Sequence, residues 1–289
     1  MSNMEQLQSG NIVTLTVKGE EGSRWVLDAH DEEIFINKSE ADDSIQIGDE
    51  IEVFLYVNRR KQLTATMRIP NMTIGTFGWA KVIRVERREG VYVDIGSSFE
   101  VLVNGADLPR LPKLWPIVGD ELYMTLRTDL GGNIFGRLAT EERVLEVIND
   151  AESTLFNANL KARPYRLLPV GSFLLTIPDN YRIFVHSSEQ QAEPRLGQEV
   201  DVRVIDVHRD GTLNGSMLPR VEERLSGDSE VIYTYLVEIG GKMPFTDKSS
   251  PEEIKEMFNL SKGAFKRALG RLMREKRVVQ EDGWTKIVE

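Results

Sequence analysis

The chain has 289 residues with 46 acidic and 36 basic side chains, which gives a formal net charge of -10. At this length we expect more than one domain, because single cores rarely grow beyond about 250 residues. The sequence contains no cysteine, which excludes disulfides and thiolate metal sites. No apolar run approaches the ~18 residues of a membrane span, and the N-terminus lacks the features of a signal peptide. We therefore expect a cytoplasmic protein.

The acidic side chains are concentrated in two segments. Residues 1–70 carry 13 acidic and 7 basic side chains, and residues 140–156 carry five acids against Arg143 alone. The remaining regions are close to neutral. The overall charge therefore disfavours non-specific binding to polyanions, but it leaves room for a local basic face.

A unit of roughly 60 residues occurs three times along the chain. Each copy has two strand-like runs, a short third strand, a Gly-Asp or Gly-Gln turn and a final hairpin, over residues 22–68, 90–139 and 171–219. In the third copy, Asp210-Gly211 is a two-residue hairpin signal. Five short strands in so small a unit predict a closed or partly open β-barrel, which removes exposed sheet edges.

The three units resemble the OB-fold RNA-binding domain first described in ribosomal protein S-one. That family has Gly-small-aromatic-Val on its second strand and apolar-Val-His-small-Ser-Glu on its third. The third unit matches best, with GSFL at 171–174 and FVHSSE at 184–189. The second unit has GVYV at 90–93 and Asn104 in the place of the histidine. The first unit, which is also the acidic one, matches least, with SRWV at 23–26 and Asn37.

Two interpretations of the aromatic side chains compete. Because residues of one parity on adjacent strands face the same side, Phe173 can lie beside Phe184 and His186. On an outward face they would stack unpaired bases, each contributing about 1–3 kcal/mol; otherwise they fill a small core. We favour the outward platform for Phe173 and His186, and Phe184, Tyr92 and Trp25 are further candidates. Basic side chains on neighbouring strands could meet phosphates, namely Lys161, Arg163, Arg166 and Arg182.

Residues 140–156 separate the second unit from the third. Their apolar side chains keep helical spacing, at Val144, Val147, Ile148, Ala151 and Leu155. This spacing predicts an amphipathic connector helix whose apolar side packs against a barrel.

The last part of the chain, residues 226–289, has a different pattern. Ile232, Tyr235, Leu236 and Ile239 lie at helical spacing before a Gly-Gly pair. Ser250, Pro251 and Glu253 predict a second helix that begins with a capping box. A third helix follows Ser261, with a buried stripe at Phe265, Ala268, Leu269 and Leu272. A strand, an Asp-Gly turn and a final strand complete a pattern that resembles a winged helix.

The third of these helices would be the recognition helix of a winged helix. It carries Lys262, Lys266, Arg267, Arg271 and Arg274, and Lys276 lies just beyond it. A basic exposed face of this kind is compatible with phosphate contact, although a solvated helix face and a protein-docking module remain alternatives.

Three S-one-type units followed by a winged helix resemble the conserved virulence factor B family of bacterial RNA-binding proteins. The resemblance implies cytoplasmic RNA binding with a regulatory effect on gene expression, including virulence-associated genes in some members. We therefore expect a mainly β chain with a small α+β module. Its expected parts are OB-fold domains at 1–70, 71–139 and 157–220, a connector helix at 140–156, and a winged helix at 226–289.

Motifs for catalysis are absent from the sequence. It has no GxGxxG, no Gly-rich GK[ST] loop and no GxSxG elbow, and its three histidines are scattered. We expect neither enzyme activity nor a cofactor or metal. Single-stranded RNA is the expected partner. The alternatives are a protein-docking scaffold for the ribosome or transcription machinery, and a winged-helix DNA binder.

Overall fold

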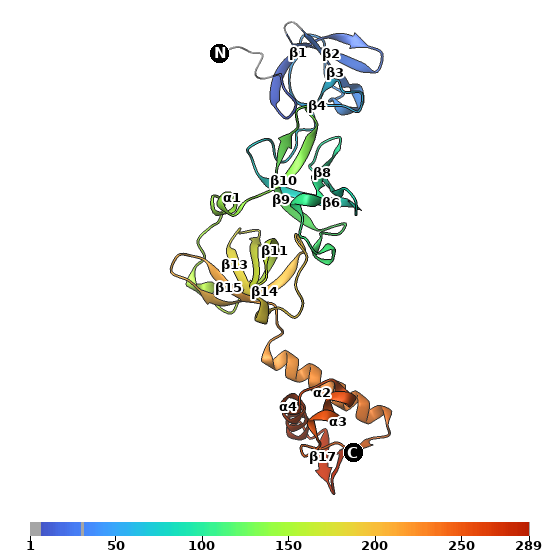
Figure 1. Ribbon diagram of the computed structural model, residues 1–289, viewed down its shortest axis with the longest axis vertical. Helices are drawn as coiled ribbons and strands as arrows, with labels where there is room; N and C mark the ends of the chain where they lie inside the picture. The colour runs from blue at the N-terminus through green and yellow to red at the C-terminus, as the bar shows by residue number, and fades with distance from the viewer. Residues whose placement is uncertain (1–6, 30–31, 289) are drawn as a thin grey trace. The chain divides into compact units, whose positions relative to one another are not determined.

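The structure of the chain is a computed structural model that describes residues 7–29 and 32–288 (Figure 1). The chain divides into two compact units, Met1–Met217 and Leu218–Glu289. The first unit contains three closed β-barrels, and the second combines helices with a three-stranded sheet. The expected architecture of three OB-type barrels followed by a winged helix is confirmed.

Each barrel closes through the same pairing of its five strands. The first barrel consists of β1 (Ile12–Glu21), β2 (Arg24–Ala29), β3 (Glu32–Asn37), β4 (Glu50–Val57) and β5 (Leu63–Thr66). The second consists of β6 (Gly78–Glu86), β7 (Gly90–Asp94), β8 (Glu100–Asn104), β9 (Glu121–Thr128) and β10 (Ile134–Leu138). The third consists of β11 (Asn159–Leu168), β12 (Gly171–Ile177), β13 (Arg182–His186), β14 (Val200–Val207) and β15 (Leu213–Ser216). In every barrel the third and fifth strands pair in parallel and the other neighbours are antiparallel, which leaves no open edge.

Alternation along the strands sets the core of each barrel. In β13, Ile183 and Val185 are fully buried, whereas the residues between and beside them are partly or fully exposed. The core of the second barrel extends to its neighbours, because Phe54 of the first barrel and Leu196 from the loop before β14 pack into it. Apolar packing therefore joins the three barrels of the first unit.

The connector between the second and third barrels is a correction to the sequence analysis. Instead of a helix through residue 156, the structure has a five-residue helix α1 (Glu141–Leu145) and a later 3-10 turn (Ser153–Leu155). The backbone N–H groups of Asn149 and Ala151 donate to carbonyls of the third barrel, at Asn180 and Gly211. Because these N–H groups are hydrogen-bonded to the barrel, they are not available to continue a helix, and α1 ends early.

The second unit contains α2 (Val221–Glu238), β16 (Lys242–Met243), α3 (Pro251–Phe258), α4 (Lys262–Arg274), β17 (Val278–Glu281) and β18 (Trp284–Ile287). The predicted capping box is confirmed, since Ser250 Oγ accepts from the Glu253 N–H at 3.2 Å and Glu253 Oε2 accepts from the Ser250 N–H at 2.9 Å. The predicted stripe of α4 is fully buried against Ile232 and Leu236 of α2. Across the described parts of the chain, no helix has the length and apolar character needed to cross a membrane.

Candidate nucleic-acid interface

The second and third strands of the three barrels align residue by residue. In the third barrel Gly171 pairs with His186 and Phe173 pairs with Phe184. The same pairing in the second barrel joins Gly90 to Asn104 and Tyr92 to Leu102. The first barrel pairs Arg24 with Asn37 and Val26 with Phe35. These equivalences show which side chains occupy the outward platform position in each barrel.

The third barrel carries a row of rings on its outer surface, which we call the ring row: Tyr165, Phe173, Phe184 and His186. The centroids of Phe173 and Phe184 are 4.8 Å apart, and those of Phe184 and His186 are 6.4 Å apart. Tyr165 stacks beside Phe173 at 6.4 Å. The two phenylalanines are half-buried and His186 is exposed, while the intervening residues form the core. Phe173, Phe184 and His186 therefore share the outward face of the barrel. They do not fill its core, which was the alternative interpretation.

His186 also caps the 3-10 turn Ser187–Glu189. Its Nδ1 accepts from the backbone N–H of Ser188 at 3.2 Å and lies 2.8 Å from Ser188 Oγ. With Nδ1 as acceptor, the neutral ring carries its proton on Nε2, which leaves a donor for a ligand. In the second barrel Asn104 performs the same capping, since its Oδ1 accepts from the Ala106 N–H at 2.9 Å. The substitution of asparagine for histidine thus retains the turn but removes a ring from the surface.

The positive charge beside the ring row is partly neutralised by a residue that sequence analysis missed. The Arg182 guanidinium lies 4.1 Å from the centre of the Phe173 ring and donates to Glu141 Oε1 at 2.6 Å. Glu141, from α1, also accepts from Arg166 at 3.2 Å and from the Tyr165 hydroxyl at 3.1 Å. No motif indicates this role, because the glutamate belongs to the acidic connector and reaches the barrel only in three dimensions.

These contacts shift the pKa of Glu141 and of Tyr165, among other groups. Burial raises the pKa of the Glu141 carboxyl, but the hydrogen bonds from Arg182 and Arg166 outweigh burial, so the pKa lies below its ordinary value. Burial, together with Glu141 and against the influence of Arg182, raises the pKa of Tyr165 to about 12. Glu141 is therefore ionised and Tyr165 protonated at neutral pH.

The remaining basic candidates of the third barrel are also ion-paired. Lys161 lies 3.2 Å from Glu199 and 3.3 Å from Asp201, and its side chain is 57% exposed. Exposed pairs of this kind contribute little and exchange readily with another anion. Arg163 is only 14% exposed and bridges Glu121 of the second barrel and Glu199 of the third, each at 3.2 Å. The structure thus places Arg163 at a joint between barrels.

The second barrel presents Tyr92 at the position of Phe173. The Arg84 guanidinium lies 3.6 Å from the centre of the Tyr92 ring and is paired with Glu100 and Glu86. This ring therefore has one face against a cation, as Phe173 has. The Tyr92 hydroxyl donates to Glu89, which fixes its orientation.

Trp25 does not occupy the platform position of the first barrel, contrary to the expectation from its motif. It pairs with Ile36, has the parity of the buried Leu27, and packs against the core of this barrel. A shift of one residue along a strand moves a side chain to the opposite face. The outward positions are held by Val26 and by Phe35, which lies 4.4 Å from the Arg24 guanidinium.

The predicted winged-helix face is only partly free. Lys266 lies 3.8 Å from Asp247, and Arg271 donates to Glu275 at 2.7 Å. Three further cations on α4 make no ion pair among the residues that the structure describes, namely Lys262, Arg267 and Arg274. Lys276 follows the helix in a left-handed conformation and is exposed.

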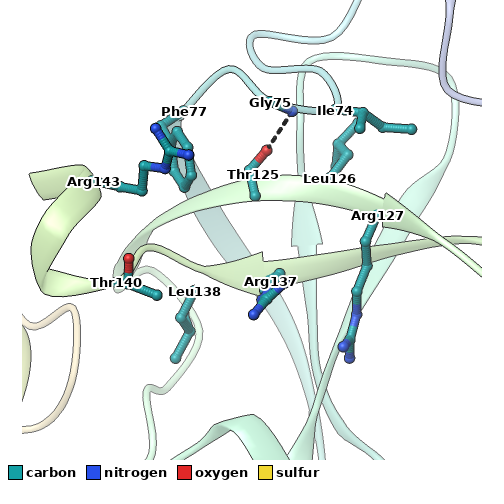
Figure 2. A pocket seen from close by; sticks show the side chains of 10 residues that line it. All are labelled: Ile74, Gly75, Phe77, Thr125, Leu126, Arg127, Arg137, Leu138, Thr140 and Arg143. Carbon is teal, nitrogen blue, oxygen red and sulfur yellow. Dashed lines mark hydrogen bonds between the residues drawn. The ribbon is translucent and has the colours of Figure 1, made fainter. Parts of the chain in front are cut away.

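A separate cavity of about 420 Å³ lies on the second barrel (Figure 2). Apolar side chains, including Phe77 and Leu126, and three arginines line it, and the Gly75 N–H donates to Thr125 Oγ1 at 3.2 Å beside it. Two of the arginines are paired, Arg127 with Asp107 and Arg143 with Glu146. The lining residues include no carboxylate and no histidine, so the cavity offers no acid–base pair.

Comparison with known families defines the class of protein first. Four family models match the chain in order: an S1 domain over residues 9–68, a CvfB first S1-like domain over 77–137, the second domain of the virulence regulatory factor CvfB over 144–219, and a CvfB-like winged helix domain over 230–287. The fold and these matches define a protein of S1-like barrels and a winged helix, with the folds of nucleic-acid-binding domains.

Full-length relatives then identify the family. Proteins named Conserved virulence factor B are 48% identical in Staphylococcus epidermidis, over 95% of this chain and 93% of the relative, and 46% identical in Staphylococcus saprophyticus, over 95% and 92%. A crystal structure from Streptococcus pneumoniae, described as a multidomain protein with nucleic acid binding domains, is 36% identical, with a TM-score of 0.68 and coverage of 97% of this chain and 98% of that one. The chain belongs to the conserved virulence factor B family.

Proposed function

We propose that this chain is a cytoplasmic RNA-binding protein that regulates gene expression, and that the ring row of the third barrel binds single-stranded RNA. The observation that carries the proposal is the ring row itself, in which Phe173 and Phe184 pair across two strands on the outer face, with His186 exposed beside them. Stacking on such rings tolerates any base, because every base has a π-face.

Polar groups around the ring row suit the rest of a nucleotide. The Nε2–H of His186 can donate to a phosphate or to a base edge. Arg182 and Arg166 lie at the other side of the row, where a phosphate would compete with Glu141 for their N–H groups. On the winged helix, Lys262, Arg267 and Arg274 would add phosphate contacts, and sites linked on one chain gain from effective concentration.

The test is fluorescence anisotropy with a short unstructured RNA over a series of salt concentrations. The variant combines Phe173→Ala with His186→Asn, because asparagine retains the turn cap as Asn104 does in the second barrel. We expect a loss of at least ~1 kcal/mol, or roughly fivefold in affinity, from the missing stack. Phe156→Ala is the matched control, since Phe156 is 63% exposed and lies outside the ring row.

Circular dichroism would show that each variant is folded. Unchanged affinity in the folded double variant would contradict the proposal. If wild-type binding were also insensitive to salt, a protein-docking scaffold would become the better explanation, because phosphate contacts necessarily release counterions.

A further inference from the structure

Two grooves lie on either side of the turn between β4 and β5, residues 58–62. One, of about 510 Å³, runs over β2 and β3 of the first barrel, where Arg24 and Phe35 line it. The other, of about 740 Å³, runs onto the second barrel past Arg84 and Tyr92. Three residues line both grooves: Tyr56, Asn58 and Arg59. The turn is therefore the shared wall of a path from one barrel to the next.

This path is basic although the first barrel as a whole is acidic. Arg59, Arg60 and Lys61 are consecutive and exposed. Within residues 7–29 and 32–288 neither arginine makes an ion pair, and Lys61 Nζ donates to the neutral Asn133 at 2.7 Å. No acid that the structure describes in the first barrel lines either groove. Glu100 of the second barrel lines one of them and is paired with Arg84, which also pairs with Glu86. Among the lining residues of the two grooves the basic side chains therefore outnumber the acidic ones.

The turn is built to hold these cations in place. Asn58 Oδ1 accepts from the backbone N–H groups of Arg60 and Gln62, at 2.8 and 3.2 Å. Lys61 has a φ of 61°, a left-handed conformation that costs a side-chain-bearing residue about 1 kcal/mol or more and glycine nothing. A lysine at a position that suits glycine points to a use for its charge.

Three flat surfaces follow one another along the path. Phe35 has the Arg24 guanidinium at 4.4 Å, Tyr92 has the Arg84 guanidinium at 3.6 Å, and Tyr56 stacks on Phe99 at 4.5 Å with an angle of 25° between the rings. Unpaired bases stack on both aromatic rings and guanidinium planes.

Tyr56, which lines both grooves, is held in place at the junction of the two barrels. The Tyr56 hydroxyl donates to Glu40 Oε2 at 3.1 Å, and the same oxygen accepts from Ser98 Oγ of the second barrel at 3.0 Å. Burial, reinforced by Glu40, raises the pKa of Tyr56 to about 12, so the phenol stays neutral. The ring is thus held in one orientation beside both grooves.

We propose that the two grooves bind one continuous segment of single-stranded RNA, which crosses from the first barrel to the second over the 58–62 turn. Bases stack along Phe35, Tyr56 and Tyr92, while Arg59 and Arg60 contact phosphates. This inference rests on the proposed function, because it requires that the chain binds RNA. It assigns a second site, formed by residues other than the ring row.

The first experiment measures RNA affinity over a salt series for the full chain with Arg59→Gln and Arg60→Gln. With an unstructured RNA of about 15 nucleotides, the loss of two phosphate contacts should reduce the salt slope by about 1.4 and the affinity by roughly tenfold. Arg87→Gln with Arg88→Gln is the matched control, because this exposed pair lies in the β6–β7 turn and lines neither groove. Equal losses in the two variants, or no loss in the first, would overturn the proposal.

The second experiment locates the RNA by photocrosslinking with 4-thiouridine and mass spectrometry of the linked peptides. Crosslinks at Phe35, Tyr56 or Tyr92 support the groove site. Crosslinks confined to the ring row would overturn it and leave the third-barrel site standing. Conversely, groove crosslinks with full affinity in the Phe173→Ala, His186→Asn variant would support the groove and overturn the ring row as the binding site. No binding at all would overturn both.

Discussion

Replacing Glu141 by glutamine should destabilise the three-barrel part of the chain, Met1–Met217, and strengthen the proposed binding of RNA. Glu141 pairs with Arg182 and Arg166 beside the ring row. Under the proposed function a phosphate would compete with this carboxylate for the two guanidinium groups. A substitution that removes only the negative charge therefore acts in opposite directions on stability and on affinity.

The loss of stability follows from the burial of the pair. The side chains of Glu141 and Arg182 are only 22% and 19% exposed, so Arg182 would lose a counterion that solvent cannot fully replace. The glutamine oxygen can still accept one hydrogen bond. We expect the free energy of unfolding to fall by about 1–3 kcal/mol, less than for a fully buried pair.

The gain in affinity follows from local charge. Two arginines and one glutamate give this side of the ring row a net charge of about +1, which rises to about +2 in the variant and adds roughly one phosphate contact. The salt slope should then steepen by about 0.7, and affinity should increase roughly three- to tenfold at low salt.

Anisotropy and chemical denaturation on the same samples test both effects. Glu142→Gln is the control, because Glu142 is exposed and makes no ion pair within the described segments. The stability that Glu141 contributes also depends on pH, because its folded pKa lies below its ordinary value. This stabilisation is present above the unfolded pKa of 4.5 and is lost as the pH falls through the lowered folded value. The variant should lack this acid-dependent loss. Should Glu141→Gln weaken both stability and binding, Glu141 would support the ring row and would not compete with a phosphate for Arg182 and Arg166.

Two further predictions concern the third barrel. In the wild type, stability should fall between pH 10 and about 12, because the folded state keeps a phenolic proton that the unfolded state releases from about pH 10. Tyr165→Phe should reduce this fall, which denaturation at a series of pH values would measure. An unchanged alkaline profile would contradict the raised pKa. Gly171→Ala should lower the free energy of unfolding by about 2–4 kcal/mol, since Gly171 has a φ of 151° and a Cβ there would collide with the Val185 carbonyl oxygen. Thermal melting is the assay, and a loss below about 1 kcal/mol would mean that β12 can move away.

The local features of the fold were predictable from the sequence because their physical causes are local. Alternation and turn residues indicated five short strands three times over, and each set closes into a barrel. The capping box at Ser250 and Glu253 needs only residues three apart, and the apolar stripe of α4 needs only helical spacing. In both cases the chain itself brings the partners together.

The site was only partly predictable. The parity of β12 and β13 places Phe173, Phe184 and His186 on one face, as expected. The same argument failed for Trp25, because its motif was aligned one position away from the strand register that the first barrel adopts. Register depends on pairing with a partner strand, which no single run of residues specifies.

The contacts that decide charge and access came from the tertiary structure alone. Glu141 lies in a segment that predicted a long helix, but backbone donors at Asn149 and Ala151 bind the third barrel, end that helix early and leave the glutamate against Arg182. The basic turn at Arg59 belongs to the most acidic of the three barrels. Only the fold shows that none of the acids described in this barrel lines either of its grooves. Sequence determined the modules because periodicity and capping act between near neighbours. Which charges are neutralised and which remain free depends on residues far apart in the chain, and folding alone brings these together.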